Sequence, residues 1–160
     1  MQFSGGTLDD VLLYNAGDAT WTGGNVAVVN GAAITNRLSG TFDDQTDGTF
    51  GDSGPICPTF TIEGLFIKSG GNGTTYLQMD LFNSGRVEIR NGILNVSCGF
   101  VQAGGSTAAT GGTITGDVDI HGGSVEGNVP ANYTVSDEVT VPRQLHRFPP
   151  PDIRNHPRGS

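Results

Sequence analysis

The amino-acid sequence predicts an all-β solenoid, in which short strands wind into rungs and each rung stacks on the one before it. The first observation is the alternation of apolar and polar residues, as in residues 82–98, where Glu88 separates Val87 from Ile89. The second is a recurring glycine at positions 17, 40, 64 and 85, with spacings of 23, 24 and 21 residues. The third is composition, because 26 of the 160 residues are glycine, which suits a chain with many turns.

Residues 1–15 are predicted to form an N-terminal cap or the first rung. Thr7 and Asp10 could form a helical capping box. Leu8, Val11 and Leu12 have helical spacing, so a short helix is one interpretation. Because the run is short, a strand fits the segment at least as well.

Residues 16–141 are predicted to form the repeat domain. Stacking of the rungs at about 4.8 Å lets the backbone of one rung pair with the next. Glycine would supply positive φ at the corners, and asparagine is the next best residue there and can form side-chain ladders. Ile62 interrupts the asparagine series. The predicted corner residues are Asn15, Gly17, Asn36, Gly40, Gly64, Asn83, Gly85 and Gly92.

Two segments fall outside the repeat. Residues 51–59, with the sequence GDSGPICPT, are predicted to form a loop that projects from one rung. Residues 142–160 are rich in proline and arginine and lack the glycine corners. They are therefore predicted to form a disordered or irregular tail.

Hairpins are the competing interpretation of the same strands. The dipeptide Asn91-Gly92 is typical of a type I′ turn, and a meander or sandwich would use similar strands. The regular spacing of the glycines favours coils over hairpins. In a coil, Val87 and Ile89 would face the interior, and Arg86 and Arg90 would lie outside.

The charge distribution argues against several classes of partner. The formal net charge is −8, and residues 1–142 contain four basic residues against fifteen acidic ones. Such an acidic body argues against nucleic acid and anionic membranes as partners. No apolar run is long enough to span a bilayer, and residues 1–8 lack the features of a signal peptide. We therefore expect either an intracellular protein or part of a longer exported one.

Four segments resemble the Gly/Thr/Asn-rich β-helix repeats of secreted bacterial surface proteins of the adhesin or autotransporter-passenger type. They are NAGDATWTGGNV, GTFDDQTDGTF, FIKSGGNGTT and FNSGRVEIRNGILNVSCGFVQAGGS, and the resemblance covers roughly residues 6–130. It implies a right-handed, single-stranded parallel β-helix at the cell surface or outside the cell, with no catalytic residue to transfer. The chain departs from the pattern in its two cysteines, in Arg86 and Arg90, and in residues 142–160.

Asp117, Asp119 and His121 form the sharpest local signal for chemistry. On a strand the three side chains point to one side, where they could bind a divalent metal or perform acid–base catalysis. The alternative is that Val118 and Ile120 face the core and the polar residues form the solvent-exposed side of the strand. The sequence favours this alternative, because a fold alone does not confer function.

A second acidic group lies in FDDQTDG, where oxygen atoms of Asp43, Asp44 and Asp47 could bind Ca²⁺. The spacing matches neither an EF-hand nor a calcium-binding solenoid repeat. A charged turn that discourages edge aggregation is therefore the favoured interpretation, and no other cofactor is expected.

The two cysteines, Cys57 and Cys98, leave the question of a disulfide open. They are 41 residues apart, close to two rungs. Equivalent positions two rungs apart would be separated by about 9–10 Å, beyond the usual Cα limit of about 7 Å. Cys57 lies on the predicted loop and could fold back, but Cys98 is expected to be a small core residue.

A glycan-stacking stripe is conceivable at Trp21, Phe42, Phe66, Phe82 and Phe100. Most of these rings are expected to fill the interior of the coil. Trp21 is the candidate for an exposed, ligand-binding residue.

The sequence repeats a shape without repeating a reactive group, which favours a non-catalytic structural or adhesive role. Such a segment could bind glycans, and unpaired backbone on its end rungs could join copies end to end. A polysaccharide lyase or glycoside hydrolase is the alternative, but the acids are dispersed and the bases are few. Ice binding would need a flat Thr-x-Thr array, and residues 20–22 and 113–115, which fit that pattern, are far apart in the sequence.

Overall fold

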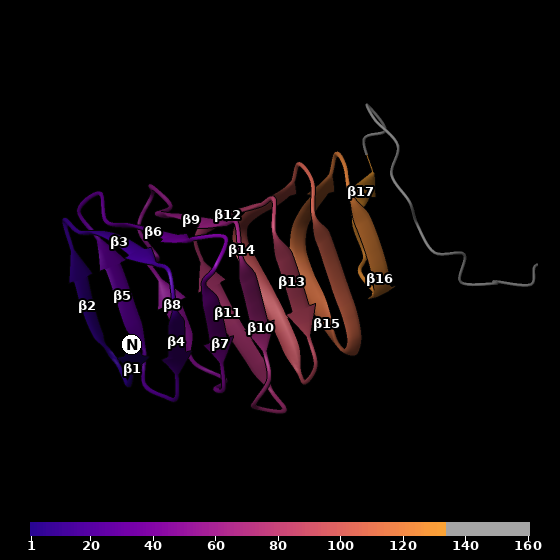
Figure 1. Ribbon diagram of the computed structural model, residues 1–160. Coiled ribbons are helices and arrows are strands. Elements are labelled where there is room, and N and C mark those ends of the chain that lie inside the picture. Colours follow the sequence, from indigo (N-terminus) through magenta and orange to yellow (C-terminus); the bar gives the residue numbers. More distant parts are fainter. Residues whose placement is uncertain (134–160) are drawn as a thin grey trace, which may run out of the picture.

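The chain folds into a parallel β-solenoid. The computed structural model describes residues 1–133, which contain 17 strands and no helix (Figure 1). Every strand pairing in this range is parallel and joins one rung to the next. The predicted all-β solenoid is therefore confirmed. The hairpin alternative is wrong, and residues 1–15 form three short strands in place of a helix.

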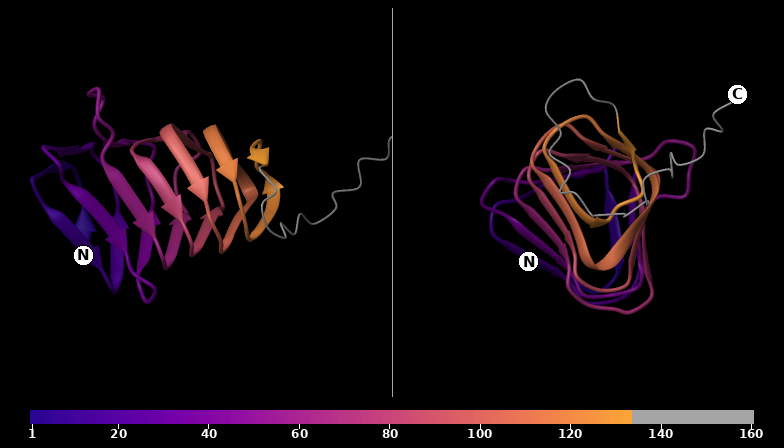
Figure 2. Two further views of the ribbon diagram at one scale, coloured as in Figure 1. Left: turned by 90° about the horizontal axis from the view of Figure 1, so that it is seen from above. Right: turned by 90° about the vertical axis from the view of Figure 1, so that its right-hand side faces the viewer.

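The strands form three sheets along the stack, here called faces A, B and C (Figure 2). Face A contains β1 (Gln2–Phe3), β4 (Asp18–Trp21), β7 (Thr41–Asp44), β10 (Leu65–Lys68), β13 (Arg86–Ile89), the start of β15 (Ser106–Ile120) and β16 (Ser124–Asn128). Face B contains β2 (Gly6–Asp9), β5 (Val26–Val29), β8 (Thr49–Gly51), β11 (Thr74–Gln78), the start of β14 (Ile93–Gln102) and the middle of β15. Face C contains β3 (Leu12–Asn15), β6 (Ala33–Asn36), β9 (Thr59–Ile62), β12 (Asp80–Asn83), the ends of β14 and β15, and β17 (Asn132–Tyr133).

The C–A corner, where the chain passes from face C to face A, brings successive rungs very close together. Gly40, Gly64 and Gly85 occupy this corner on consecutive rungs. A Cβ atom on Gly64 would lie closer than 3.0 Å to the carbonyl oxygens of Arg37 and Gly40. A Cβ atom on Gly85 would come equally close to the Gly64 carbonyl oxygen. Glycine is needed at this corner because no side chain fits between the rungs.

Positive φ, the predicted reason for the corner glycines, is wrong for most of them. Gly17, Gly40, Gly64 and Gly85 are not among the glycines with positive φ. Gly92, at the corner between faces A and B, does have a positive φ of 62°. Crowding therefore accounts for the glycines at positions 40, 64 and 85, whereas at Gly92 a positive φ adds to crowding, because a Cβ atom there would approach the Gly73 carbonyl oxygen.

Asparagines form the predicted side-chain ladder beside this corner. Asn15, Asn36 and Asn83 end strands of face C and are buried. Asn15 Nδ2 donates to Asn36 Oδ1 at 2.8 Å. Ile62 interrupts the ladder on the third rung, as predicted, and Asn83 Nδ2 resumes it by donating to Gln102 Oε1 at 3.2 Å. The ladder satisfies amide groups that would otherwise be costly to bury.

The interior of the coil is filled by side chains that meet their counterparts on neighbouring rungs. Phe42 and Phe66 stack with ring centroids 5.7 Å apart, and Trp21 packs edge-on against Phe50 at 5.1 Å. Later rungs use mostly aliphatic residues, such as the fully buried Leu94. A single rung could not bury these side chains, so the core depends on stacking.

Residues 82–98 have the predicted register. Val87 and Ile89 are fully buried, whereas Arg86 and Arg90 are exposed on face A. Glu88 also faces outward, but Arg86 Nε and Arg90 Nη2 cover it, each 2.6 Å from one of its carboxylate oxygens. The alternation in the sequence therefore predicts both sides of this strand correctly.

The repeat continues through β16 and β17, and the described range ends at Tyr133. The last part of the predicted repeat domain, residues 134–141, lies outside the described residues. The predicted tail, residues 142–160, lies outside them as well.

Crowding at the C–A corner predicts that Gly64→Ala destabilises the protein by about 3 kcal/mol, because the added methyl group must push two rungs apart. Gly17→Ala is the matched control, since it lies at the same corner of the first rung with open space around its Cβ position. We expect the control to change stability by less than about 1 kcal/mol. Denaturant unfolding measures both, and equal effects of the two substitutions would contradict the crowding argument.

Candidate functional site

Face C presents a flat outer surface that combines aromatic and hydroxyl side chains. Its strands β3, β6, β9 and β12 lie along the top of the view in Figure 1. Strand pairing aligns four outward-pointing residues in the order Tyr14, Thr35, Thr61 and Phe82, here called the face C column. Because neighbouring strands are about 4.8 Å apart, Tyr14 and Phe82 are separated by about 14 Å along the column.

Both aromatic residues of the face C column are accessible to a ligand. Tyr14 is 55% exposed and Phe82 is 45% exposed. The Arg37 guanidinium lies 4.6 Å from the centroid of the Tyr14 ring, and this cation–π contact restrains the ring. Thr35 and Thr61 are partly buried between the two rings. The column therefore offers two ring surfaces with hydroxyl groups between them.

The first four rungs of face C carry little charge. A second outward column runs beside the first, in the order Leu12, Ala33, Thr59 and Asp80. Asp80 is the only member of these two columns that is charged at neutral pH. This surface therefore suits a neutral partner better than a polyanion or a polycation.

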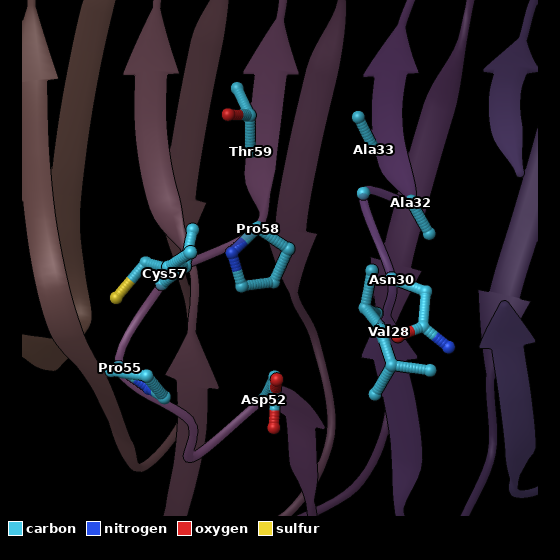
Figure 3. A pocket seen from close by; sticks show the side chains of 12 residues that line it. Val28, Asn30, Ala32, Ala33, Asp52, Pro55, Cys57, Pro58 and Thr59 are labelled. Carbon is cyan, nitrogen blue, oxygen red and sulfur yellow. The ribbon is translucent and has the colours of Figure 1, made fainter. Parts of the chain in front are cut away.

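A groove of about 350 Å³ opens at the B–C corner, where the chain passes from face B to face C. It lies between the corner of the second rung and the projecting loop of the third (Figure 3). Val28 and Ala32 lie on one side of the groove, and Pro55 lies on the other. Ala33 and Thr59, which begin strands of face C, also line it. The groove is therefore continuous with face C.

A disulfide ties the projecting loop, residues 52–58, to the side of the stack. Cys57 in the loop and Cys98 in β14 are joined, with their Cα atoms 6.2 Å apart. Both lie at the B–C corner two rungs apart, so the disulfide spans the intervening rung. The loop was predicted, but the expectation that Cys98 is a core residue is wrong. Cys98 is only half-buried, at the shift of register between Val96 and Phe100.

Asp44, Lys68 and Thr75 form a polar cluster inside the coil, and all three have 0% exposure. The Lys68 ammonium donates to Thr75 Oγ1 at 2.9 Å and to the carbonyl oxygens of Thr46 and Gly70 at 2.7 and 3.0 Å. The Thr75 hydroxyl donates to Asp44 Oδ2 at 2.7 Å, and Lys68 Nζ lies 3.7 Å from the same oxygen. The burial of an ion pair is tolerable here because neighbouring polar groups complete its hydrogen bonds.

The two carboxyl groups beside Lys68 have pKa values shifted in opposite directions. Burial raises the pKa of Asp44, although the Thr75 hydroxyl, the Thr46 N–H and the Lys68 charge oppose the rise. Desolvation also acts to raise the pKa of Asp47, but hydrogen bonds from the Gly73 N–H and Lys68 outweigh it and hold the pKa below its usual value. Asp44 is therefore the buried acid of the two, and its charged form is supported by Thr75, Thr46 and Lys68 together.

The acidic group proposed for Ca²⁺ does not form an open ligand set. The Lys68 ammonium lies between Asp44 and Asp47, 3.2 Å from Asp47 Oδ1. Asp43 instead accepts hydrogen bonds from Gln45 Nε2 at 2.6 Å and from the Ser69 hydroxyl. All three carboxylates are thus engaged within the protein.

Asp117, Asp119 and His121 do not gather into a metal site. Within residues 1–133, only Cys57, Asp80 and Cys98 bring three potential ligand atoms of His, Cys, Asp or Glu within 4.8 Å of one another. Alternate residues of a strand are about 6.6 Å apart, so a row of three does not converge unless a neighbouring rung contributes. The rungs beside Asp119 supply Val101 and Asn132 at the paired positions. Val118 and Ile120 are buried, as the alternative interpretation predicts.

Trp21 is not a ligand-binding residue on the surface. Its side chain is 0% exposed, and its Nε1 donates to the Gly23 and Gly24 carbonyl oxygens. Trp21 is at an inward position of β4, so its ring joins the aromatic core. Of the five aromatic residues considered for a stripe, only Phe82 is exposed, and the other four are fully buried.

Comparisons with protein-family models, with curated proteins and with solved structures gave no match for this chain. Within the described residues, no helix is long and apolar enough to span a membrane.

Sequence reasoning missed the buried cluster and the face C column, although both leave a signal. In β10, LFIK, Phe66 and Lys68 share one side of the strand, so an inward Phe66 implies an inward lysine that needs buried partners. Phe82 lies between the inward Leu81 and Asn83, so the same rule puts it outside. The outward position of Tyr14 could be predicted in the same way, because Tyr14 precedes the corner residue Asn15 as Phe82 precedes Asn83.

Lys68→Met should destabilise the protein by about 3 kcal/mol at pH 7, because it leaves the Asp44 carboxylate buried and unpaired. A carboxyl whose pKa is raised by folding contributes stability that is present below its unfolded pKa of about 3.9 and lost as pH rises. Loss of Lys68 raises the Asp44 pKa further, so the destabilisation should shrink as pH falls from 7 toward about 4.

Chemical denaturation of wild type and variant across this pH range measures the effect. The matched control, Asp44→Asn with Lys68→Met, removes the buried titrating group while it keeps Asp47, and should recover part of the stability at pH 7. A destabilisation that stays constant with pH would show that Asp44 and Lys68 are not energetically coupled.

Proposed function

We propose that the protein is a non-catalytic structural and adhesive segment of an extracellular or cell-surface protein, and that face C binds glycans. The face C column carries this proposal. A pyranose ring presents an apolar C–H face that packs on an aromatic ring, and its hydroxyls exchange hydrogen bonds with threonine side chains. Tyr14 and Phe82 supply the rings, and Thr35 and Thr61 supply hydroxyls between them.

Three further features support the proposal. Parallel pairing keeps the face C column straight over four rungs, so the column fits an extended polymer. The two outward columns of face C contain one charged residue, Asp80, which favours a neutral glycan over a charged one. The Cys57–Cys98 disulfide fits an oxidising compartment, where such bonds persist.

Binding to neutral polysaccharides should depend on the two exposed rings. Tyr14→Ala and Phe82→Ala should each weaken binding by about threefold to tenfold, since one ring contact is worth about 0.5–1.5 kcal/mol. Tyr76→Ala is the matched control, because Tyr76 is 46% exposed but lies on face B. Glycan-array binding followed by affinity electrophoresis gives the measurement. Equal loss with the Tyr76 variant, or no binding to any neutral glycan, would contradict the proposal.

The first rung supports association with a second copy of the chain. In the described part of the protein, β1, β2 and β3 each pair on one side only. Phe3, Leu8 and Leu13 are core side chains of this rung that remain partly exposed. Open strand edges above partly exposed core residues favour strand addition, which would extend the stack end to end.

This association should require the outward backbone N–H groups of the first rung. Gly6 N and Asp10 N donate to the second rung, so alternation directs the N–H of Thr7 to the open edge. Thr7→Pro should therefore reduce association, whereas the control Thr7→Ala keeps the N–H group and should not. Light scattering after size exclusion over a range of concentrations measures the molar mass of the wild type and of both variants. A wild-type chain that stays strictly monomeric would contradict the proposal.

A further inference from the structure

The disulfide crosses a rung that contributes a carboxylate beneath it. Cys57 and Cys98 lie two rungs apart at the B–C corner, and Asp80 begins β12 on the rung between them. Asp80 pairs with Thr59 on one side and with Gly99 on the other. Its position beside both cysteines is therefore imposed by the register of face C.

The three side chains converge closely enough to share one ion. The two Sγ atoms and a carboxylate oxygen of Asp80 all lie within 4.8 Å of one another. In tetrahedral zinc coordination with Zn–S bonds of about 2.3 Å, two sulfur ligands are about 3.8 Å apart. Separation of the sulfurs after reduction thus needs a movement of less than about 2 Å. All three side chains are half-buried, which leaves a path for the ion from solvent.

We propose that the reduced form of this corner binds one zinc ion through Cys57 Sγ, Cys98 Sγ and a carboxylate oxygen of Asp80, with water as the fourth ligand. Thiolates and a carboxylate form a ligand set that suits zinc, whereas calcium and magnesium prefer oxygen ligands alone. The site takes no part in the proposed glycan binding and does not depend on it.

The oxidised form converts to the zinc-bound form by thiol–disulfide exchange followed by metal binding. Two molecules of a thiol reductant supply two electrons and two protons, which cleave the Cys57–Cys98 bond to two thiols, and the reductant leaves as its own disulfide. Zinc then displaces the two thiol protons as it binds the thiolates. The oxidised form offers no thiolate, so it should not bind the ion.

The loop of residues 52–58 would be attached to the stack in either of two ways, by the disulfide or by the zinc ion. The disulfide would hold the loop in an oxidising compartment, and zinc would hold it before the chain arrives there. In both forms the loop stays beside the B–C corner, where it forms one wall of the groove. The wall of the groove would therefore survive a change of redox environment.

Titration of the full chain with Co²⁺, a spectroscopic substitute for zinc, tests the proposal. The chain is reduced with a phosphine, and the reductant is removed anaerobically. We expect one Co²⁺ per reduced chain, with thiolate-to-cobalt charge-transfer absorption that zinc abolishes by displacement, and no such absorption from the oxidised chain. Circular dichroism should show the same β-structure in the oxidised and the zinc-loaded reduced forms.

Variants separate the ligands from general effects of reduction. Cys57→Ser and Cys98→Ser should each remove high-affinity binding, and Asp80→Asn should weaken it at least about tenfold. Asp80→Asn keeps the disulfide, so unchanged stability of its oxidised form would exclude misfolding as the cause. Asp18→Asn, an exposed acid on face A, is the control that should bind like wild type.

Three results would overturn the proposal. They are a reduced chain without charge-transfer absorption, undiminished affinity in the Asp80 variant, and a reduced chain that unfolds and is not refolded by zinc.

Discussion

The close approach of backbones at the C–A corner is the constraint on which the rest of the structure depends. From Gly40 onward, the corner glycine lies against carbonyl oxygens of the rung before it, as Gly64 does with Arg37 and Gly40. This contact leaves no room for a side chain, and it lets the strands of all three faces keep the spacing of parallel pairing. The hydrogen bond between Asn15 and Asn36 lies beside the same corner. Spacing, register and core packing are thus coupled at one edge of the stack.

Regular stacking also explains how the surface acquires its character. Once register is fixed, every outward position becomes part of a column, and the chemistry of a face is the sum of its columns. On face A this brings Glu88 between two arginines, and on face C it aligns Tyr14 with Phe82 across two threonines. A straight, weakly charged column is better suited to holding an extended neutral polymer than to enclosing a small substrate. The groove at the B–C corner adds a concave border to this flat surface.

Much of the fold follows from the sequence, because alternation and the spacing of glycines act over short distances. The strand register around Val87 and Ile89 and the interruption of the ladder at Ile62 are read directly from such patterns. The patterns do not show how closely the backbones of neighbouring rungs approach at each corner, or how far a loop reaches along the stack. They suggested positive φ where Gly64 is needed for crowding, and they did not reveal that the loop carries Cys57 across a whole rung to Cys98. Trp21, the candidate for an exposed aromatic residue, belongs to the core because its position in β4 points inward.

Distances between corners measure the rung spacing most directly. Three exposed residues follow equivalent strand ends on the first, fourth and fifth rungs, namely Ala16, Ser84 and Ala103. Spin labels at Ala16 and Ser84 should be about 14 Å apart at the backbone, and labels at Ala16 and Ala103 about 19 Å apart, because each rung adds about 4.8 Å. Pulsed electron paramagnetic resonance on the oxidised chain can compare the two pairs. An increment of about 5 Å is the result that stacked parallel rungs predict, whereas equal distances, or a shorter distance for the second pair, would contradict the stack.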